Sequence, residues 1–177
     1  MGRTQLQDAV PMRLGQSFHA YASVIQRDIH RLENAQKEMY RLNMGGTAIG
    51  TAINVSHSYL QHICPKIAEL TGLPFASADD LFDATQNLDG FVTVSSSLKT
   101  CAVNLSKLCN DLRLLSSGPR TGFAEITLPP KQNGSSIMPG KINPVIPEVV
   151  SQVAFNIIGN DCTITMAAEA GQLELNA

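Results

Sequence analysis

The stretch of residues 88–112 reads L-D-G-F-V-T-V-S-S-S-L-K-T-C-A-V-N-L-S-K-L-C-N-D-L, and it decides the fold class. Apolar or small residues recur along it at strictly alternating steps of three and four. This is a repeat of 3.5 residues, the period of helices that pack side by side with a left-handed twist. No proline interrupts the run. The sequence therefore predicts a long helix with a packing seam at Leu88, Phe91, Ser95, Leu98, Ala102, Leu105, Cys109 and Leu112.

A second long helix is predicted upstream, where apolar residues recur at steps of three or four over residues 14–42 and Gly45-Gly46 is the expected end. Each helix would contain about 27–30 residues and be roughly 40–45 Å long. A compact domain of this size has a radius of gyration of only about 16 Å, so such helices need partners beyond one chain. The expected fold is an all-α bundle of long helices that oligomerises through its seams. A self-contained up-and-down bundle is the alternative.

Shorter helices are expected between the two long ones. Residues 58–71 read as a helix that Gly72 ends. Ala78 or Asp79 is expected to cap another short helix, which leads toward the second long one.

The rest of the chain is expected to be irregular, with one exception. Ser117-Gly118-Pro119-Arg120 ends the long helix, and residues 121–133 look extended. A last helix is predicted from Pro144 onward. Residues 2–11 read as a loop that enters a helix, and almost no strand pattern appears.

Composition narrows the possible partners. The net charge is −2, with 13 basic and 15 acidic residues, so neither a basic face nor a nucleic-acid partner is expected. No apolar run approaches the ~18–20 residues of a membrane span. The four cysteines (Cys64, Cys101, Cys109, Cys162) lack C-x-x-C spacing, which favours packed, reduced thiols and a cytoplasmic location. The four histidines form no metal-binding motif, so no metal is expected.

Residues 134–144 read G-S-S-I-M-P-G-K-I-N-P, directly before an apolar helical stretch. Asn143 is a strong candidate for the helix N-cap, with Pro144 at the first helical position. Unpaired backbone N–H groups and the positive end of the helix dipole would gather there, and Lys141 adds a full charge. The pattern predicts a site for an anion such as a carboxylate. The alternative is a surface loop without chemistry.

This loop resembles the signature loop of the aspartase/fumarase superfamily. Residues 2–12 resemble that superfamily's second active-site segment, and residues 43–51 resemble its Gly-rich turn. Residues 110–120 and 166–176 are more similar to the aspartate ammonia-lyase members than to fumarases. The resemblance implies a homotetramer on a bundle of long helices, active sites built from three subunits, and conversion of L-aspartate to fumarate and ammonia without a cofactor.

By matching positions, the resemblance assigns roles to residues of the loop. Ser135 would be the general base that removes a proton from the carbon beside the β-carboxylate. Ser136 would contact the β-carboxylate, while Lys141 and Asn143 would hold the α-carboxylate. The alternative for Ser135 is a turn residue whose side chain bonds nearby backbone.

Thr4 and Gln5 would face the substrate from a different subunit. Many relatives carry histidine at the position of Gln5. Glutamine keeps a donor and an acceptor but cannot take a proton, so this departure from the relatives argues against a proton shuttle at this position.

The remaining loop residues, Gly134, Ile137, Met138, Pro139 and Gly140, suggest a lid over the substrate. The glycines allow backbone conformations that other residues resist, and the tip is apolar. An ordered loop packed by that same tip is the alternative.

The resemblance also implies that residues 1–177 are the central helical-bundle domain of a larger polypeptide, without its N-terminal domain and its C-terminal part. The 177-residue chain alone is therefore expected to be inactive. Two other functions stay open at this point: a fumarase-type hydratase, and a helical assembly module without catalysis.

Overall fold

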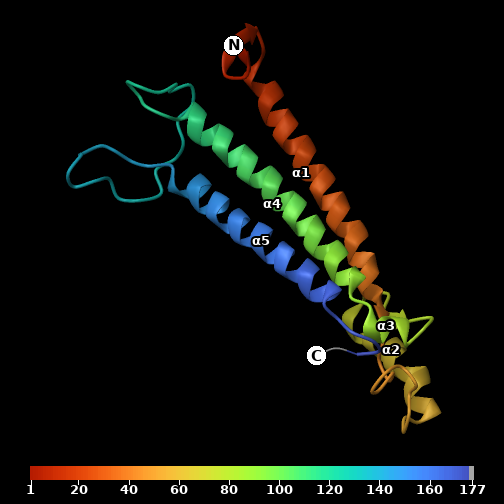
Figure 1. Cartoon of the computed structure of the whole chain (residues 1–177). Helices are drawn as coiled ribbons and strands as arrows, with labels where there is room; N and C mark the ends of the chain where they lie inside the picture. The colour runs from red at the N-terminus through yellow and green to blue at the C-terminus, as the bar shows by residue number, and fades with distance from the viewer. Residues whose placement is uncertain (176–177) are drawn as a thin grey trace. The chain divides into compact units, whose positions relative to one another are not determined.

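The computed structural model describes residues 1–175. Asn176 and Ala177 lie outside the described residues, and Asn176 is the last residue of the segment 166–176. Long helices dominate it: α1 (Leu14–Gln36), α4 (Asp89–Leu115) and α5 (Val145–Glu169) (Figure 1). The prediction of an all-α fold built on long helices is confirmed.

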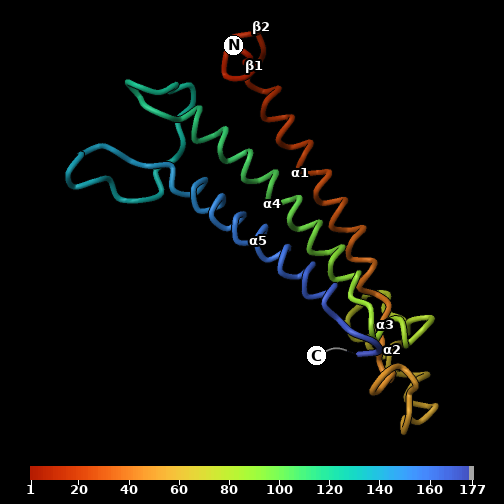
Figure 2. The backbone as a smooth tube through the Cα atoms, in the orientation of Figure 1, coloured from red at the N-terminus to blue at the C-terminus, as the bar shows by residue number. Residues whose placement is uncertain are grey.

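The chain divides into two compact units. The first contains Met1–His30 and Cys101–Ala154, and the second contains Arg31–Thr100 and the chain from Phe155 on. Because the division falls within the long helices, each unit contains a stretch of α1, of α4 and of α5 (Figure 2).

The first unit opens with a β-hairpin, where the sequence predicted a loop. Strand β1 (Gly2–Thr4) pairs antiparallel with β2 (Gln7–Val10). The turn residues Gln5 and Leu6 both adopt positive φ, 49° and 66°. Such turns are usually announced by Asn-Gly or Asp-Gly, so Gln-Leu gave no signal for a hairpin.

Buried and part-buried polar contacts join α1 to α4 within the first unit. The Asp28 carboxylate is 1% exposed, and the side-chain amide of Asn104 donates to both of its oxygens at 2.9 Å. Seven residues before Asp28 on α1, the Tyr21 hydroxyl donates to Asp111 Oδ2 at 3.0 Å. Buried polar groups with such directional partners fix how two helices face each other more sharply than apolar contacts do.

Helix α1 ends at Gln36, so the prediction that it continues through residue 42 is wrong. The chain first tightens into the 3₁₀ helix η1 (Lys37–Tyr40). It then extends into β3 (Arg41–Leu42), which pairs in parallel with β4 (Ala76–Ser77). The apolar pattern runs on because Met39 and Leu42 stay half-buried, although the backbone is no longer helical.

The second unit also contains α2 (His57–Thr71), which confirms the predicted helix with a start one residue earlier. The Ser56 hydroxyl caps it by accepting the Tyr59 N–H at 3.2 Å. Gly72 ends it in the left-handed conformation that favours glycine, with φ 69°.

Helix α3 (Asp83–Gln86) follows, and its cap differs from the prediction. Phe82 is the N-cap and makes no side-chain cap bond, while Asp80, rather than Ala78 or Asp79, accepts the backbone N–H of Phe82 at 2.8 Å. All three positions lie in one short stretch, and only the backbone path decides which side chain reaches the helix start.

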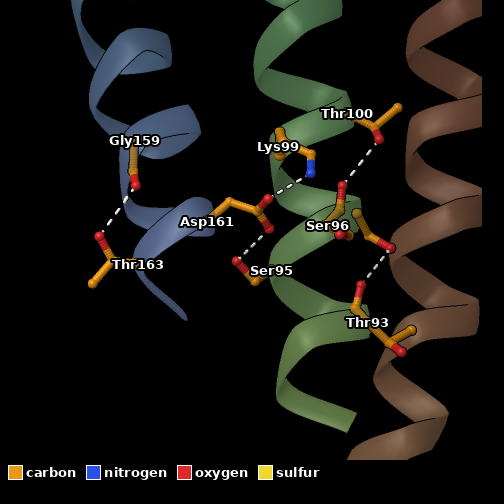
Figure 3. Close-up of polar contacts among 9 residues, drawn as sticks. Thr93, Ser95, Ser96, Lys99, Thr100, Gly159, Asp161 and Thr163 are labelled. Carbon is orange, nitrogen blue, oxygen red and sulfur yellow. Dashed lines mark hydrogen bonds and ion pairs between the residues drawn. The ribbon is translucent and has the colours of Figure 1, made fainter. Parts of the chain in front are cut away.

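Within the second unit, α4 and α5 meet at a buried carboxylate (Figure 3). Asp161 on α5 is 3% exposed. Its Oδ1 accepts from the Ser95 hydroxyl at 2.8 Å, and its Oδ2 pairs with the Lys99 ammonium at 2.5 Å. The hydrogen bond from Lys99, followed by that from Ser95, holds the pKa of Asp161 below its ordinary value.

The predicted seam of α4 separates into two rows. Ser95, Ala102 and Cys109, each seven residues apart, are buried within the chain. The alternate row faces outward. It contains exposed large apolar side chains, namely Phe91, Leu98 and Leu105. The small residues therefore make the contacts inside the chain, while the large ones remain uncovered.

Two further findings concern partners of the chain. Within residues 1–175, no helix is both long enough and apolar enough to cross a membrane, and no cluster of His, Cys, Asp and Glu could hold a metal ion. The four cysteines are free, with Cys64 and Cys109 buried and Cys162 exposed. Burial raises the pKa of the Cys64 and Cys109 thiols, as expected for packed, unreactive groups.

Candidate functional site

The loop of residues 134–143 lies between α4 and α5, where the backbone leaves the helices in open loops (Figure 2). Backbone bonds close it: the Ser135 N–H donates to the Lys141 carbonyl at 3.2 Å, and the Lys141 N–H donates to the Met138 carbonyl at 3.0 Å. Gly140 turns the chain with φ 86°. These bonds bring the backbones of Ser135 and Lys141 next to each other although the two residues are six positions apart.

The half-buried Ser135 side chain takes part in this turn. Its Oγ accepts the backbone N–H of Met138 at 3.1 Å. This is the turn role that the sequence offered as the alternative to catalysis. The same N–H also places a donor on the oxygen that would carry negative charge if the hydroxyl lost its proton.

The other loop side chains face solvent. Ile137 is 87% exposed and Met138 is 49% exposed, so the apolar tip does not pack against the described chain. Ser136 and Lys141 are also exposed. The expectation that this tip packs an ordered loop against its own chain is not met within residues 1–175.

The start of α5 differs slightly from the prediction. The first helical bond runs from the Glu148 N–H to the Pro144 carbonyl at 3.4 Å, and the helix begins at Val145. Pro144 therefore occupies the N-cap, and Asn143 stands one residue before it. The Asn143 carbonyl instead accepts the Val145 N–H at 2.9 Å, which tightens the entry to the helix.

Thr4 and Gln5 lie at the exposed tip of the β-hairpin. The residue before them, Arg3, reaches across to the segment that follows α4. Its guanidinium forms a forked ion pair with the Glu125 carboxylate, with Nη1 donating to Oε2 at 3.3 Å and Nη2 paired with Oε1. It also lies 4.5 Å from the centre of the Phe123 ring. The hydrogen bond from Arg3 holds the pKa of Glu125 below its ordinary value.

Sequence reasoning missed this pairing. Arg3 and Glu125 are 122 residues apart, and neither belongs to a periodic pattern. Residues 2–12 drew attention to the hairpin only because Thr4 and Gln5 were candidate site residues. Arg3 itself was not singled out.

A cavity of about 620 Å³ lies beside the hairpin in the first unit. Its polar lining includes Arg3, Gln5, Tyr21, Asp111 and Glu125, and its other walls are largely apolar. Burial and the hydrogen bond to Asp111 raise the pKa of Tyr21 to about 12. The polar groups of this cavity are therefore largely paired with one another.

The predicted site residues do not meet in one place within the described chain. Gln5 lines the larger cavity, whereas Asn143 lines a smaller one of about 220 Å³ together with Lys131. No hydrogen bond or ion pair within residues 1–175 connects the hairpin tip to the loop of Ser135. Within the described chain, Gln5 and Asn143, which the sequence assigned to one site, therefore line different cavities.

Known proteins resemble this chain closely. A family model described as lyase matches residues 1–159. The chain is 57% identical to an aspartate ammonia-lyase of Bacillus subtilis (strain 168), 60% identical to one of Helicobacter pylori (strain ATCC 700392 / 26695) and 54% identical to one of Escherichia coli (strain K12). Each similarity covers 99% of the chain, which spans 37–38% of the length of these relatives.

Solved structures show the same backbone. The crystal structure of a fumarate lyase:delta crystallin from Brucella melitensis bound to cobalt matches with a TM-score of 0.94 and 55% identity. The match covers 99% of this chain and 38% of the Brucella melitensis chain. A recombinant class II fumarase from Schistosoma mansoni also reaches a TM-score of 0.94, at 39% identity over 98% of this chain and 40% of its own.

Proposed function

Because this chain belongs to the lyase family whose model matches residues 1–159, we propose that the protein containing it converts L-aspartate reversibly to fumarate and ammonia. One observation carries the choice of substrate. The chain is 54–60% identical to aspartate ammonia-lyases over 99% of its length, against 39% for a class II fumarase whose backbone matches with a TM-score of 0.94. Because a fumarase shares this backbone, the proposal of L-aspartate rests on the closer sequence similarity.

The reaction is a β-elimination in which Ser135 acts as the base. Its alkoxide takes a proton from the carbon beside the β-carboxylate, and the electron pair left behind spreads into that carboxylate as a doubly negative aci form. The pair then forms the C=C bond of fumarate while the C–N bond to the protonated amino group breaks, and neutral ammonia leaves with the electrons of that bond. Donors already in position around the growing charge lower this barrier most, and no cofactor is required.

The loop geometry supports Ser135 in this role. A serine oxygen becomes a base only where positive potential stabilises its alkoxide. The Met138 N–H donates to Oγ at 3.1 Å, and Lys141, whose carbonyl accepts the Ser135 N–H, adds a positively charged residue to the same turn. A bond to a charged oxygen is roughly twice as strong as one to a neutral hydroxyl, so the Met138 amide favours the reactive form.

The carboxylates of the substrate would be held by the remaining loop residues. Ser136 donates to the β-carboxylate, while Lys141 and Asn143 hold the α-carboxylate by charge and by an amide N–H. The exposure of Ser136 and Lys141 leaves both side chains open to a ligand. Thr4 and Gln5 would contact the same substrate from a neighbouring subunit.

We attribute the separation of these residues to a site shared between subunits of a homotetramer. The outward row of α4, with Phe91, Leu98 and Leu105, supports this arrangement because large apolar side chains in a regular row are usually covered by a partner helix. Helix α5 supports it too, since Val149 and Phe155 are exposed among apolar neighbours.

Supplying the full-length protein with L-aspartate and, separately, with L-malate tests the substrate. Fumarate absorbance should rise with L-aspartate and stay flat with L-malate. The alternative is a fumarase, like the similar protein of Schistosoma mansoni. It requires fumarate absorbance to rise with L-malate and to stay flat with L-aspartate. The isolated 177-residue chain should turn over neither substrate, because it spans only 37–38% of the length of the aspartate ammonia-lyases that it resembles.

A further inference from the structure

The β-hairpin that carries Thr4 and Gln5 has little support of its own. Its strands are only 3 and 4 residues long, and every residue of β2 is exposed. A two-stranded hairpin of this kind is at best marginally stable in water. Its tip can hold a ligand at a fixed place only if contacts from elsewhere in the chain anchor it.

Arg3 supplies such an anchor from the strand that leads directly into the tip. Its forked ion pair with Glu125 fixes the guanidinium in direction as well as distance, because two donors engage two acceptors. The ring of Phe123 adds a cation–π contact at 4.5 Å. We call Arg3, Phe123 and Glu125 the hairpin clamp.

Phe123 and Glu125, the two residues of the clamp that contact Arg3, are themselves bonded to residues at and just after the end of α4. The Phe123 N–H donates to Ser117 Oγ at 3.1 Å, and the Glu125 N–H donates to the Leu115 carbonyl at 2.9 Å. These bonds flank both side chains that meet Arg3. A continuous set of bonds therefore runs from the end of a long helix, through the clamp, to the residue before Thr4.

We propose that the hairpin clamp is a positioning device for substrate binding: Arg3, held by Glu125 and Phe123, sets where Thr4 and Gln5 meet the substrate. This inference rests on the proposed function, which places those two residues against L-aspartate. Arg3 acts through its neighbours and does not touch the reacting atoms. Loss of the clamp therefore weakens substrate binding more than it slows the chemical step.

The geometry of the clamp also determines which substitutions preserve it. Lysine at position 3 keeps the charge but offers a single ammonium instead of a planar fork, so it can engage only part of the Glu125 carboxylate. Glutamine at position 125 keeps the shape but loses the charge. Exchanging the two residues restores both charge and fork, with the partners reversed.

The test uses the full-length enzyme in its assembled form, with the variants Arg3→Met, Arg3→Lys, Glu125→Gln and the exchange Arg3→Glu/Glu125→Arg. Arg3→Met should raise KM for L-aspartate about 10-fold while kcat stays within about threefold, because the lost contacts hold the substrate equally in ground and transition states. Arg3→Lys and Glu125→Gln should fall between Arg3→Met and the unsubstituted enzyme. The exchange should return KM toward its original value.

Amide hydrogen exchange gives a readout that does not depend on activity. In Arg3→Met, exchange at residues 2–10 should accelerate, whereas exchange in α2 should stay unchanged. The matched control is Lys66→Met, which removes the cation of an exposed ion pair with Glu69 on α2. That variant should leave KM, kcat and hairpin exchange as they were.

Two results would overturn the clamp: unchanged hairpin exchange in Arg3→Met, or a fall in kcat with KM unchanged, which marks a purely structural role. If Arg3→Met does not fold, the milder Arg3→Lys and the exchange variant decide by the same readouts. The outcome is separable from the proposed function. An unsubstituted enzyme that ignores L-aspartate refutes that function, while hairpin exchange still decides whether Arg3 anchors the tip.

Discussion

The bond from the Met138 N–H to Ser135 Oγ serves both the turn and the proposed chemistry. With a neutral hydroxyl it closes the turn and contributes about 1 kcal/mol. With an alkoxide it becomes charge-assisted and roughly twice as strong. The turn role and the catalytic role of Ser135 are therefore compatible, because the donor that orders the resting side chain gains strength once the proton has left.

Replacing Ser135 with alanine separates these contributions. In the full-length enzyme, Ser135→Ala should lower kcat about 10²–10⁴-fold, the range expected when a positioned base is lost. Its unfolding free energy should change by about 1 kcal/mol, because only one hydrogen bond disappears. The control is Ser97→Ala on α4, where the hydroxyl bonds the Thr93 carbonyl at 3.0 Å and should not affect kcat. A Ser135→Ala enzyme with near-normal kcat would exclude Ser135 as the base.

Gly140 allows the backbone of the same loop to be tested. A Cβ at this position meets nothing within 4 Å, so the cost of Gly140→Ala comes only from its φ of 86°. We expect a loss of about 1 kcal/mol in unfolding free energy, because alanine resists the left-handed region. We also expect lower kcat, because the turn that presents Ser135 shifts.

The control for that substitution is Gly15→Ala in α1. A Cβ there also meets nothing within 4 Å, but Gly15 is helical and its φ is not positive. Alanine should therefore stabilise the protein by roughly 0.5 kcal/mol and leave kcat unchanged. Equal effects of both substitutions in urea unfolding would contradict the role given to the Gly140 backbone.

Among the elements, α4 and α5 depend on the buried Asp161 within the second unit. Ser95 and Lys99 are four residues apart on one face of α4, and both reach the same carboxylate of α5 (Figure 3). A carboxylate that is 3% exposed tolerates no other register of the helices without losing its partners. The polar contact therefore specifies the pairing that small residues such as Ala102 permit.

Asp161→Asn should lower the unfolding free energy by about 2 kcal/mol at pH 7, because hydrogen bonds to a charged group are lost. The lowered pKa of Asp161 fixes the sign of its pH dependence. The stabilisation is present above the ordinary pKa of aspartate and disappears as pH falls through the lower pKa of the folded state. The difference between the two proteins should therefore shrink below about pH 4.

Denaturant unfolding at a series of pH values measures this difference. Glu69→Gln serves as the control, since its ion pair with Lys66 is exposed and should change the unfolding free energy by less than about 1 kcal/mol at any pH. A difference for Asp161→Asn that grows on acidification would show that the carboxylate is not stabilised in its charged form.

The elements also show what the sequence alone could predict. The strict 3.5-residue repeat located α4 because periodicity along one helix is local information. The same reasoning extended α1 too far, since Met39 and Leu42 stay half-buried in a chain that has left the helix to pair with β4. The hairpin was missed because its Gln5-Leu6 turn carries no turn signal, whereas the pairing of Arg3 with Glu125 depends on a contact across 122 residues, which no local pattern records.

At the scale of the whole molecule, the uncovered row of α4 predicts a partner. Leu98→Glu should reduce the assembled state, because a buried charge in an apolar helix contact lacks a counter-ion. Sedimentation should show smaller species and the activity of the full-length enzyme should fall with them. Leu70→Glu is the control, since Leu70 is 74% exposed on α2 and lies outside the seam. Unchanged assembly in Leu98→Glu would argue against this row as an interface.

The separation of Thr4 from Ser135 leads to a sharper test of the shared site. If one active site takes Thr4 from one subunit and Ser135 from another, neither Thr4→Ala nor Ser135→Ala damages every site of a mixed assembly. Random mixing of equal amounts should leave about a quarter of the sites with both native residues, since each is native with a probability of one half in a closed symmetric oligomer.

The experiment dissociates and reassembles the two variant enzymes together and compares their activity with each variant treated alone. Recovery toward about a quarter of the native activity is expected, because the active sites that regain both residues are complete. If Thr4 and Ser135 of the same chain met in one site, every site in the mixture would still lack one of them. Activity would then stay at the level of the separate variants, and the shared-site arrangement would be wrong.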